Sequence, residues 1–215
     1  MKFDENCTKC RRLNQFLIKT KEDFPDYYCK PVAPFGDSNG HLLIVGLAPG
    51  LHGANKTGRP FTGDYAGILL YETLYEFGFS SAPQSINNDQ LELRDCKITN
   101  AVKCLPPANK PLPEEVKNCN KFLACEIHTL PKNSLILALG TIAHKAVLEA
   151  LELKKSNYKF AHGSRHKLIN GLILYDSYHC SRYNTQTKRL TKDMFQNIFK
   201  LIVQERGENK CHISM

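Results

Sequence analysis

Four cysteines have residue types and spacing that could bind a metal. Cys7 and Cys10 form a Cys-x-x-Cys pair, and Cys104 and Cys119 form a second, wider pair. Four thiolates can close a tetrahedral zinc site or hold an iron–sulfur cluster, and spacing alone does not separate the two. Cys125 could replace Cys119 as the fourth ligand. The alternative without a metal is that these are buried structural cysteines. The pattern favours a metal centre.

A second chemical feature is the glycine-rich stretch "GLAPGLHGANKTGRPFTGD", which runs from Gly46 to Asp64. It contains neither G-x-x-x-x-G-K-[ST] nor G-x-G-x-x-G, so the common phosphate-binding loops are excluded. Its one carboxylate, Asp64, falls at the expected N-cap of a helix. There it either caps the helix, or is kept ionised by backbone amides and orients a water against a cationic transition state. Phe61 is either an apolar anchor or a stacking surface for a nucleobase.

Polar side chains follow two other predicted strands. Asn100 could read the edge of a base or form a turn, and Asn109, among prolines, is more typical of a turn. His179 could donate a hydrogen bond to a carbonyl that gains negative charge, or could be structural. The segment after it, Ser181–Arg189, mixes hydroxyl and basic side chains, which suits contacts to a DNA backbone but also a solvated loop.

The elements that must position these residues alternate between strands and helices. Short apolar runs predict strands at His41–Leu47, Lys97–Cys104 and Ser134–Gly140, and an Asn-Gly turn within Lys167–His179 leads into a last strand. Helical spacing predicts helices at Tyr65–Phe79, Pro113–Leu130, Thr141–Leu151 and Lys192–Glu205. This order indicates an α/β fold with a parallel sheet, whose ligand site lies at the carboxyl ends of the strands.

Composition limits the class of protein. The 215 residues fit one domain, and the net charge of +8 favours a polyanionic partner such as nucleic acid. Nine cysteines without a secretory signal argue for reduced thiols or metal ligands. No apolar run is long enough for a membrane span, and we expect a cytoplasmic, bacterial protein without a membrane partner.

Taken together, these motifs resemble the uracil-DNA glycosylase superfamily, and most closely its iron–sulfur family 5, with family 4 as the nearest alternative. The match is carried by the Gly46–Asp64 stretch, by "ITNAVKCLPPANKP", by "YHCSRYNTQTKRLT" and by the spaced cysteines. The resemblance implies a three-layer α/β/α sandwich around a central, mainly parallel four-stranded sheet. It also implies one domain over residues 1–215, in which residues 1–40 are tied to the core by a [4Fe–4S] cluster. Zinc is the alternative metal.

The resemblance assigns roles to single residues. The cluster ligands would be Cys7, Cys10, Cys104 and Cys119. Asp64 matches the proposed catalytic carboxylate of family 5, and His179 matches the histidine that faces the base carbonyl. Asn100 matches the base-reading asparagine of family 4 and Asn109 an asparagine with a similar role in family 5, so both are retained. The remaining predicted substrate contacts are Gly46, Phe61, Ser181 and Asn184. The chain departs from the family pattern at Cys180, where a proline is usual, and at Lys188, where a glycine is usual.

The implied activity is that of a monofunctional DNA glycosylase. Such an enzyme flips uracil, or another deaminated base such as hypoxanthine or xanthine, out of DNA and hydrolyses its N-glycosidic bond, which leaves an abasic site. The expected partners are double- and single-stranded DNA, and the expected state is a monomer. The alternative is a non-catalytic, cluster-bearing protein that binds nucleic acid.

Overall fold

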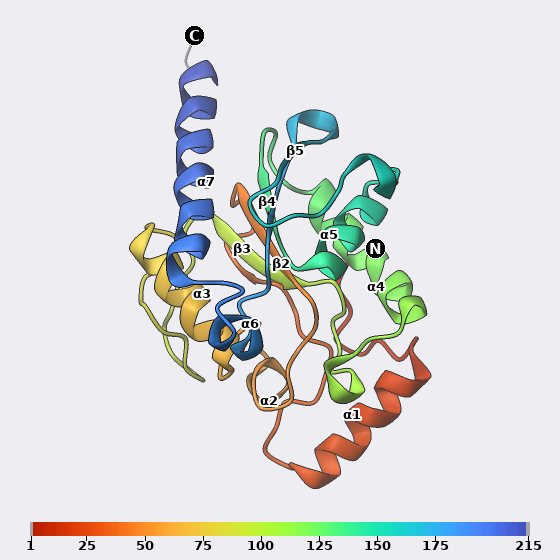
Figure 1. The fold of residues 1–215 in the computed structure, drawn as a ribbon. Helices are drawn as coiled ribbons and strands as arrows, with labels where there is room; N and C mark the ends of the chain where they lie inside the picture. Colours follow the sequence, from red (N-terminus) through yellow and green to blue (C-terminus); the bar gives the residue numbers. More distant parts are fainter. Residues whose placement is uncertain (1, 214–215) are drawn as a thin grey trace.

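The chain is built around one sheet, seen in a computed structural model that describes the backbone of residues 2–213 and the side chains of residues 2–207 (Figure 1). In the described part the strand order is β1-β3-β2-β4-β6-β5. The strands are β1 (Phe35–Gly36), β2 (Leu42–Gly46), β3 (Cys96–Asn100), β4 (Leu135–Leu139), β5 (Arg165–Lys167) and β6 (Ile173–Ser177). The four central strands are parallel and the two edge strands are antiparallel. The predicted four-stranded core is thus extended by two short edge strands.

The central strands are apolar because both of their faces are covered. Every residue of β2, β3, β4 and β6 is buried, as expected for parallel strands between two helical layers. The predicted strand at Lys97–Cys104 ends earlier, at Asn100, after which the chain bends. The carboxyl ends of β2 and β3 meet, since Gly46 pairs in register with Asn100. This edge of the sheet carries the candidate site.

Helices cover both faces of the sheet, which confirms the predicted three-layer sandwich. The helices α3 (Tyr65–Glu76) and α7 (Lys192–Ile213) pack on one face, where Leu70 and Phe199 share an apolar core with Ile44. The helices α4 (Pro113–His128) and α5 (Thr141–Ala150) pack on the other face. Figure 1 shows the two pairs on opposite sides of the strands. Helix α7 also continues past its predicted end.

Several elements have no counterpart in the sequence prediction. Helix α1 (Arg11–Asp23) packs Leu13 and Leu17 against Val102 and Leu105, beside two of the cysteines. The shorter ones are α2 (Ala54–Thr57), α6 (Arg182–Gln186) and the 3₁₀ helices Pro107–Asn109, Lys155–Asn157 and Ile169–Gly171. Within the described residues, none of the helices has both the length and the apolar character that a bilayer span requires.

The predicted Asn-Gly turn is confirmed. Asn170 and Gly171 have φ angles of +57° and +74°, which are the left-handed values that such a turn requires. They connect the edge strand β5 to β6. Strand β6 then leads directly into the segment that carries His179.

Candidate active site

A cavity of about 430 Å³ lies at the carboxyl edge of the sheet. Its walls come from the glycine-rich stretch, from the end of β3 and the loop beyond it, and from the segment after β6. The lining residues predicted from the sequence are Phe61, Asp64, Asn100, Asn109, His179 and Ser181. Three stretches far apart in the chain therefore converge on one cavity, as expected for the ligand site of a parallel sheet.

Asp64 has the first of the two roles that the sequence left open. It is the N-cap of α3, where its Oδ1 accepts a hydrogen bond from the Gly67 N–H at 2.9 Å. Its Oδ2 lies beside two glycines of the same stretch: a Cβ on Gly53 would approach it to 2.5 Å, and one on Gly50 to 3.7 Å. Gly53 is thus needed for the close passage of the backbone, and the residue that caps α3 also lines the cavity.

The electrostatic setting of Asp64 is a balance of opposing effects. Burial raises the pKa of this carboxyl above its ordinary value, while hydrogen bonds from the N–H groups of Gly67 and Ala66 lower it. Burial is the largest of these effects, so the net shift is upward. The amides act in the predicted direction, but the removal of water from the carboxylate outweighs them.

Phe61 packs in the wall of the cavity and is nearly covered, with 6 % of its surface exposed. Its backbone has a φ of +55°, a conformation that bulky residues rarely adopt. Its ring lies nearly parallel to that of His179, with the ring centroids 5.9 Å apart. A Cβ on Gly46 would come within 2.6 Å of Phe61 Cζ, so Gly46 makes the room in which the ring lies.

The two candidate asparagines occupy different environments. Asn100 is 3 % exposed, and among the described residues its buried Oδ1 has no hydrogen-bond partner. An unsatisfied buried acceptor is costly, and a ligand that donates a hydrogen bond would remove that cost. Asn109 is exposed, with a φ of +55° in the 3₁₀ helix that follows the cysteine Cys104. The geometry favours Asn100 as the residue that reads a ligand and Asn109 as part of the rim.

His179 lies at the cavity wall as an uncharged donor. Burial lowers the pKa of its imidazole to about 4, so the ring is neutral at physiological pH. The Asn184 Nδ2 group donates a hydrogen bond to the His179 carbonyl oxygen at 2.8 Å. Ser181 caps α6 and lines the cavity, but Asn184 does not line it. The amide of Asn184 thus fixes the backbone of the loop, and its predicted contact to the substrate stays a prediction.

Among the cavity residues that the sequence reasoning missed, two have large polar or aromatic side chains. Tyr65 lines the cavity next to Asp64, and Arg182 lines it with its guanidinium 6.0 Å from the centroid of the Tyr65 ring. Tyr65 was assigned only to the start of a helix, although its position directly after Asp64 was the available signal. Arg182 was treated only as part of a basic run. Both place polar and aromatic groups at the mouth of the cavity, beside the predicted DNA-contacting segment.

The four predicted metal ligands lie close together beside α1. Cys104 and Cys119 are buried in one small apolar cluster, against which Cys10 packs. Burial raises the pKa of the Cys104 thiol, and the charges of Cys119, Cys7 and Cys10 raise it further, which places all four within electrostatic reach. Cys125 is not among the groups that act on Cys104. The Asn118 side chain donates a hydrogen bond to Cys10 Sγ at 3.7 Å.

The chemistry of the donor set limits which metal group these residues could hold. Four cysteine thiols that act on one another electrostatically are a donor set that fits either a [4Fe–4S] cluster or a zinc ion.

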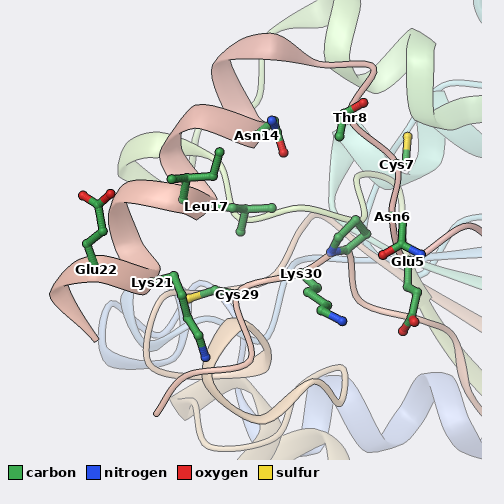
Figure 2. A pocket seen from close by; sticks show the side chains of 12 residues that line it. Glu5, Asn6, Cys7, Thr8, Asn14, Leu17, Lys21, Glu22, Cys29 and Lys30 are labelled. Atoms are coloured by element: carbon green, nitrogen blue, oxygen red, sulfur yellow. The ribbon is translucent and has the colours of Figure 1, made fainter. Parts of the chain in front are cut away.

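A larger cavity, of about 570 Å³, lies beside Cys7 but contains none of the predicted base-binding residues. Figure 2 shows its walls: Asn14, Leu17, Lys21 and Glu22 from α1, the segment of residues 5–8, and Cys29 with Lys30. It is therefore not the candidate base pocket, despite its size.

A carboxylate, a neutral imidazole and an unsatisfied amide oxygen around one cavity at the strand ends define an α/β protein that binds a small polar, planar ligand. Comparison with known proteins gives the family. The family model described as "Uracil DNA glycosylase superfamily" matches residues 33–202, and the chain belongs to this superfamily.

Curated relatives narrow the branch. The chain is 45% identical to a type-5 uracil-DNA glycosylase of Thermus thermophilus, over 89% of this chain and 90% of the relative. It is 37% identical to a type-5 enzyme of Pyrobaculum aerophilum, over 94% of this chain and 90% of the relative. A type-4 uracil-DNA glycosylase of Archaeoglobus fulgidus is 32% identical, over 69% of this chain and 62% of the relative. The expected resemblance to family 5, with family 4 more distant, is confirmed.

Proposed function

We propose that this protein is a monofunctional uracil-DNA glycosylase of the type-5 branch, which removes uracil from DNA in base excision repair. The observation that carries the proposal is the meeting of Asp64, Asn100 and His179 around one cavity at the strand ends. Family membership supports the same activity. A non-catalytic nucleic-acid-binding protein would need the basic surface and the cysteines, but not these three groups together.

Recognition of the base is assigned to Asn100 and Phe61. The free Oδ1 of Asn100 accepts the N3–H of a flipped uracil, which satisfies the buried oxygen. Phe61 provides an aromatic wall against which the planar base packs. Flipping is required because neither the base edge nor the sugar C1′ can be reached inside the stacked duplex.

Bond cleavage is assigned to Asp64 and His179. The bond between C1′ and N1 breaks and its electron pair leaves with the base, so that positive charge grows on the sugar and negative charge on uracil O2. Asp64 stabilises the sugar cation and orients a water whose oxygen bonds to C1′, and the released proton passes through the carboxylate to solvent. The neutral His179 donates a hydrogen bond to the developing oxyanion.

DNA binding is assigned to the segment that follows His179. The run Ser181–Arg189 forms α6 and its flanks, with hydroxyl and basic side chains beside the cavity mouth. The net charge of +8 supports attraction to the phosphate backbone of double- and single-stranded DNA. We further propose that one subunit is sufficient, which light scattering of the free protein checks.

We propose a [4Fe–4S] cluster on Cys7, Cys10, Cys104 and Cys119, with zinc as the alternative. The proposal is supported by the mutual electrostatic effects of the four thiols, which are the donor set that such a cluster requires. When bound, the cluster would supply a covalent link between the segment of residues 1–40, the end of β3 and helix α4. None of these four cysteines lines the cavity, so the proposed role is structural. A brown protein with an absorption band near ~400 nm would support iron over zinc.

The proposed activity is tested with a duplex that contains one uracil. The protein should convert the strand to an alkali-labile abasic product that stays intact without alkali. DNA that remains uncleaved after alkali treatment, at stoichiometric protein, would contradict the proposal, and binding without product would support the non-catalytic alternative. Duplexes with hypoxanthine or xanthine in place of uracil define how broad the specificity is.

A further inference from the structure

Two histidines and an aspartate lie close together where α5 packs near β5 and β6. None of them lines the cavity or belongs to the four cysteines. Asp176 lies in β6, His144 in α5 and His166 in β5. The His144 Nδ1 atom is 2.8 Å from Asp176 Oδ1, and His166 Nε2 is 3.0 Å from Asp176 Oδ2. Their ligand atoms all lie within 4.8 Å of one another, and among the described residues no other group of histidine, cysteine or acidic side chains does so.

The carboxylate of this group is unusually isolated from basic side chains. The side chain of Asp176 is 0% exposed and that of His144 is 2% exposed. Within the described part of the chain, the ion-pair partners of Asp176 are His144 and His166 and include no lysine or arginine. Buried carboxylates in proteins are usually paired with a positive charge or coordinate a metal. A bound cation would supply such a partner here.

The hydrogen bonds of His144 indicate where a cation would sit. Its Nε2 faces the Tyr158 carbonyl oxygen at 2.9 Å, while its Nδ1 faces the Asp176 carboxylate. Both neighbours only accept hydrogen bonds, yet a neutral imidazole has one N–H. If Nε2–H donates to Tyr158, the lone pair of Nδ1 points toward Asp176. An outer carbonyl that fixes one ring nitrogen in this way is typical of histidines that bind a metal through the other.

We propose that His144 Nδ1, His166 Nε2 and an Asp176 carboxylate oxygen bind a divalent cation of the zinc class. Two imidazoles and one carboxylate are ligands that such an ion prefers, and a water would complete a tetrahedral set. The site is structural, because its three ligands lie on a helix, a central strand and an edge strand that the ion would join. It is separate from the thiol centre and shares no residue with it.

An ion at this site would also affect the backbone that carries His179. The backbone of Asp176 exchanges hydrogen bonds with the preceding loop, from Gly163 N–H and to the Ser164 carbonyl oxygen. In the same loop, the His162 ring stacks on Tyr178, and its Nδ1 accepts a hydrogen bond from the Tyr178 N–H at 3.2 Å. Tyr178 directly precedes His179 in the chain. An ion at Asp176 would therefore fix the backbone that leads to His179.

The test uses the full-length protein with its thiol centre loaded, stripped of loosely bound metal by a chelator and titrated with Zn²⁺ alone. The wild type should bind one additional equivalent of Zn²⁺ and gain thermal stability. The variant His166→Gln should weaken this binding more than about tenfold, since a ligand is lost. The matched control His162→Gln changes a neighbouring histidine that is not a proposed ligand, and should bind Zn²⁺ as the wild type does. Equal binding by His166→Gln and wild type would overturn the proposal, as would no uptake by the wild type.

A second measurement covers the case in which His166→Gln does not fold. Co²⁺ added to the wild type should give weak visible d–d bands without new thiolate-to-cobalt charge-transfer bands, because the ligands are nitrogen and oxygen. Charge-transfer bands alone would mean that the ion binds cysteines, and would overturn the site. Absence of any cobalt spectrum would mean that the three side chains bind no ion, which also overturns it.

Discussion

Gly46 and Asn100 face each other as register partners at the ends of two parallel strands, and a Cβ on Gly46 would lie 2.4 Å from Asn100 Oδ1. The same Cβ would meet the Phe61 ring. A single hydrogen atom in place of a side chain thus leaves room for both groups that hold the base in the proposed mechanism. The strand register creates the base pocket.

We predict that Gly46→Ala lowers uracil excision at least about tenfold, because the new methyl displaces Asn100 or Phe61 from the base. Single-turnover rates and base-binding affinity measure this. Gly207→Ala is the control, since its Cβ would meet no atom within 4 Å. Equal rates for Gly46→Ala and Gly207→Ala would show that the contact at Gly46 is unimportant.

The two asparagines should separate in their effects. We predict that Asn100→Ala reduces excision by roughly a hundredfold or more, because it removes a buried acceptor aimed at the base. Asn109→Ala, at the exposed rim, should change it by less than about tenfold. The comparison of kcat/KM for both variants on one uracil duplex checks this. A larger loss in Asn109→Ala would transfer the base-reading role to Asn109.

The lowered pKa of His179 should make the folded protein sensitive to acid. Its pKa of about 4 in the folded chain lies below the value of about 6.5 expected after unfolding. The unfolded state therefore takes up a proton first, and stability contributed by the neutral ring is lost as the pH falls from about 6.5 through about 4. Denaturant unfolding of the wild type should show a steeper loss over this range than that of His179→Asn. Parallel curves for the two proteins would refute the shift.

Substitution of single cysteines should distinguish metal ligands from cysteines that bind no metal. Cys119→Ser should lose iron and destabilise the protein, because Cys119 is buried beside Cys104 and within reach of Cys7 and Cys10. Cys125→Ser should keep its iron content. Metal analysis and thermal unfolding of both variants check the assignment. If Cys125→Ser lost its iron and Cys119→Ser kept it, Cys125 would be the ligand in place of Cys119.

Helices and strands were predicted from the sequence where they carry a clear apolar pattern, and were missed where they do not. The central strands and the helices α3, α4 and α5 were predicted because each carries a continuous apolar run or a clear helical period. Helix α1 was missed because only Leu13, Leu17 and Thr20 are buried along it, too few for a strong periodic pattern. The edge strands β1 and β5 span two and three residues, too short for any alternation to be visible.

Contacts between side chains within the cavity could not be predicted from the sequence. Asp64 and His179 were identified by type and by resemblance, but the upward pKa shift of Asp64 depends on burial that only packing decides. The choice between Asn100 and Asn109 likewise depends on which side chain is enclosed. The sequence also does not reveal that the Asn184 amide donates a hydrogen bond to the His179 carbonyl oxygen. The group around Asp176 joins distant elements and gave no local motif.

The central claim, that Asp64 is the catalytic carboxylate of a glycosylase, is tested most directly by Asp64→Asn. Asparagine keeps the cap of α3, because its side-chain oxygen still accepts from the Gly67 N–H, but removes the charge. Single-turnover uracil excision and DNA affinity should be measured for both proteins. We predict a loss of at least about a hundredfold in the excision rate with nearly unchanged DNA binding and thermal stability. A near-normal excision rate would contradict the account and leave Asp64 with its capping role alone.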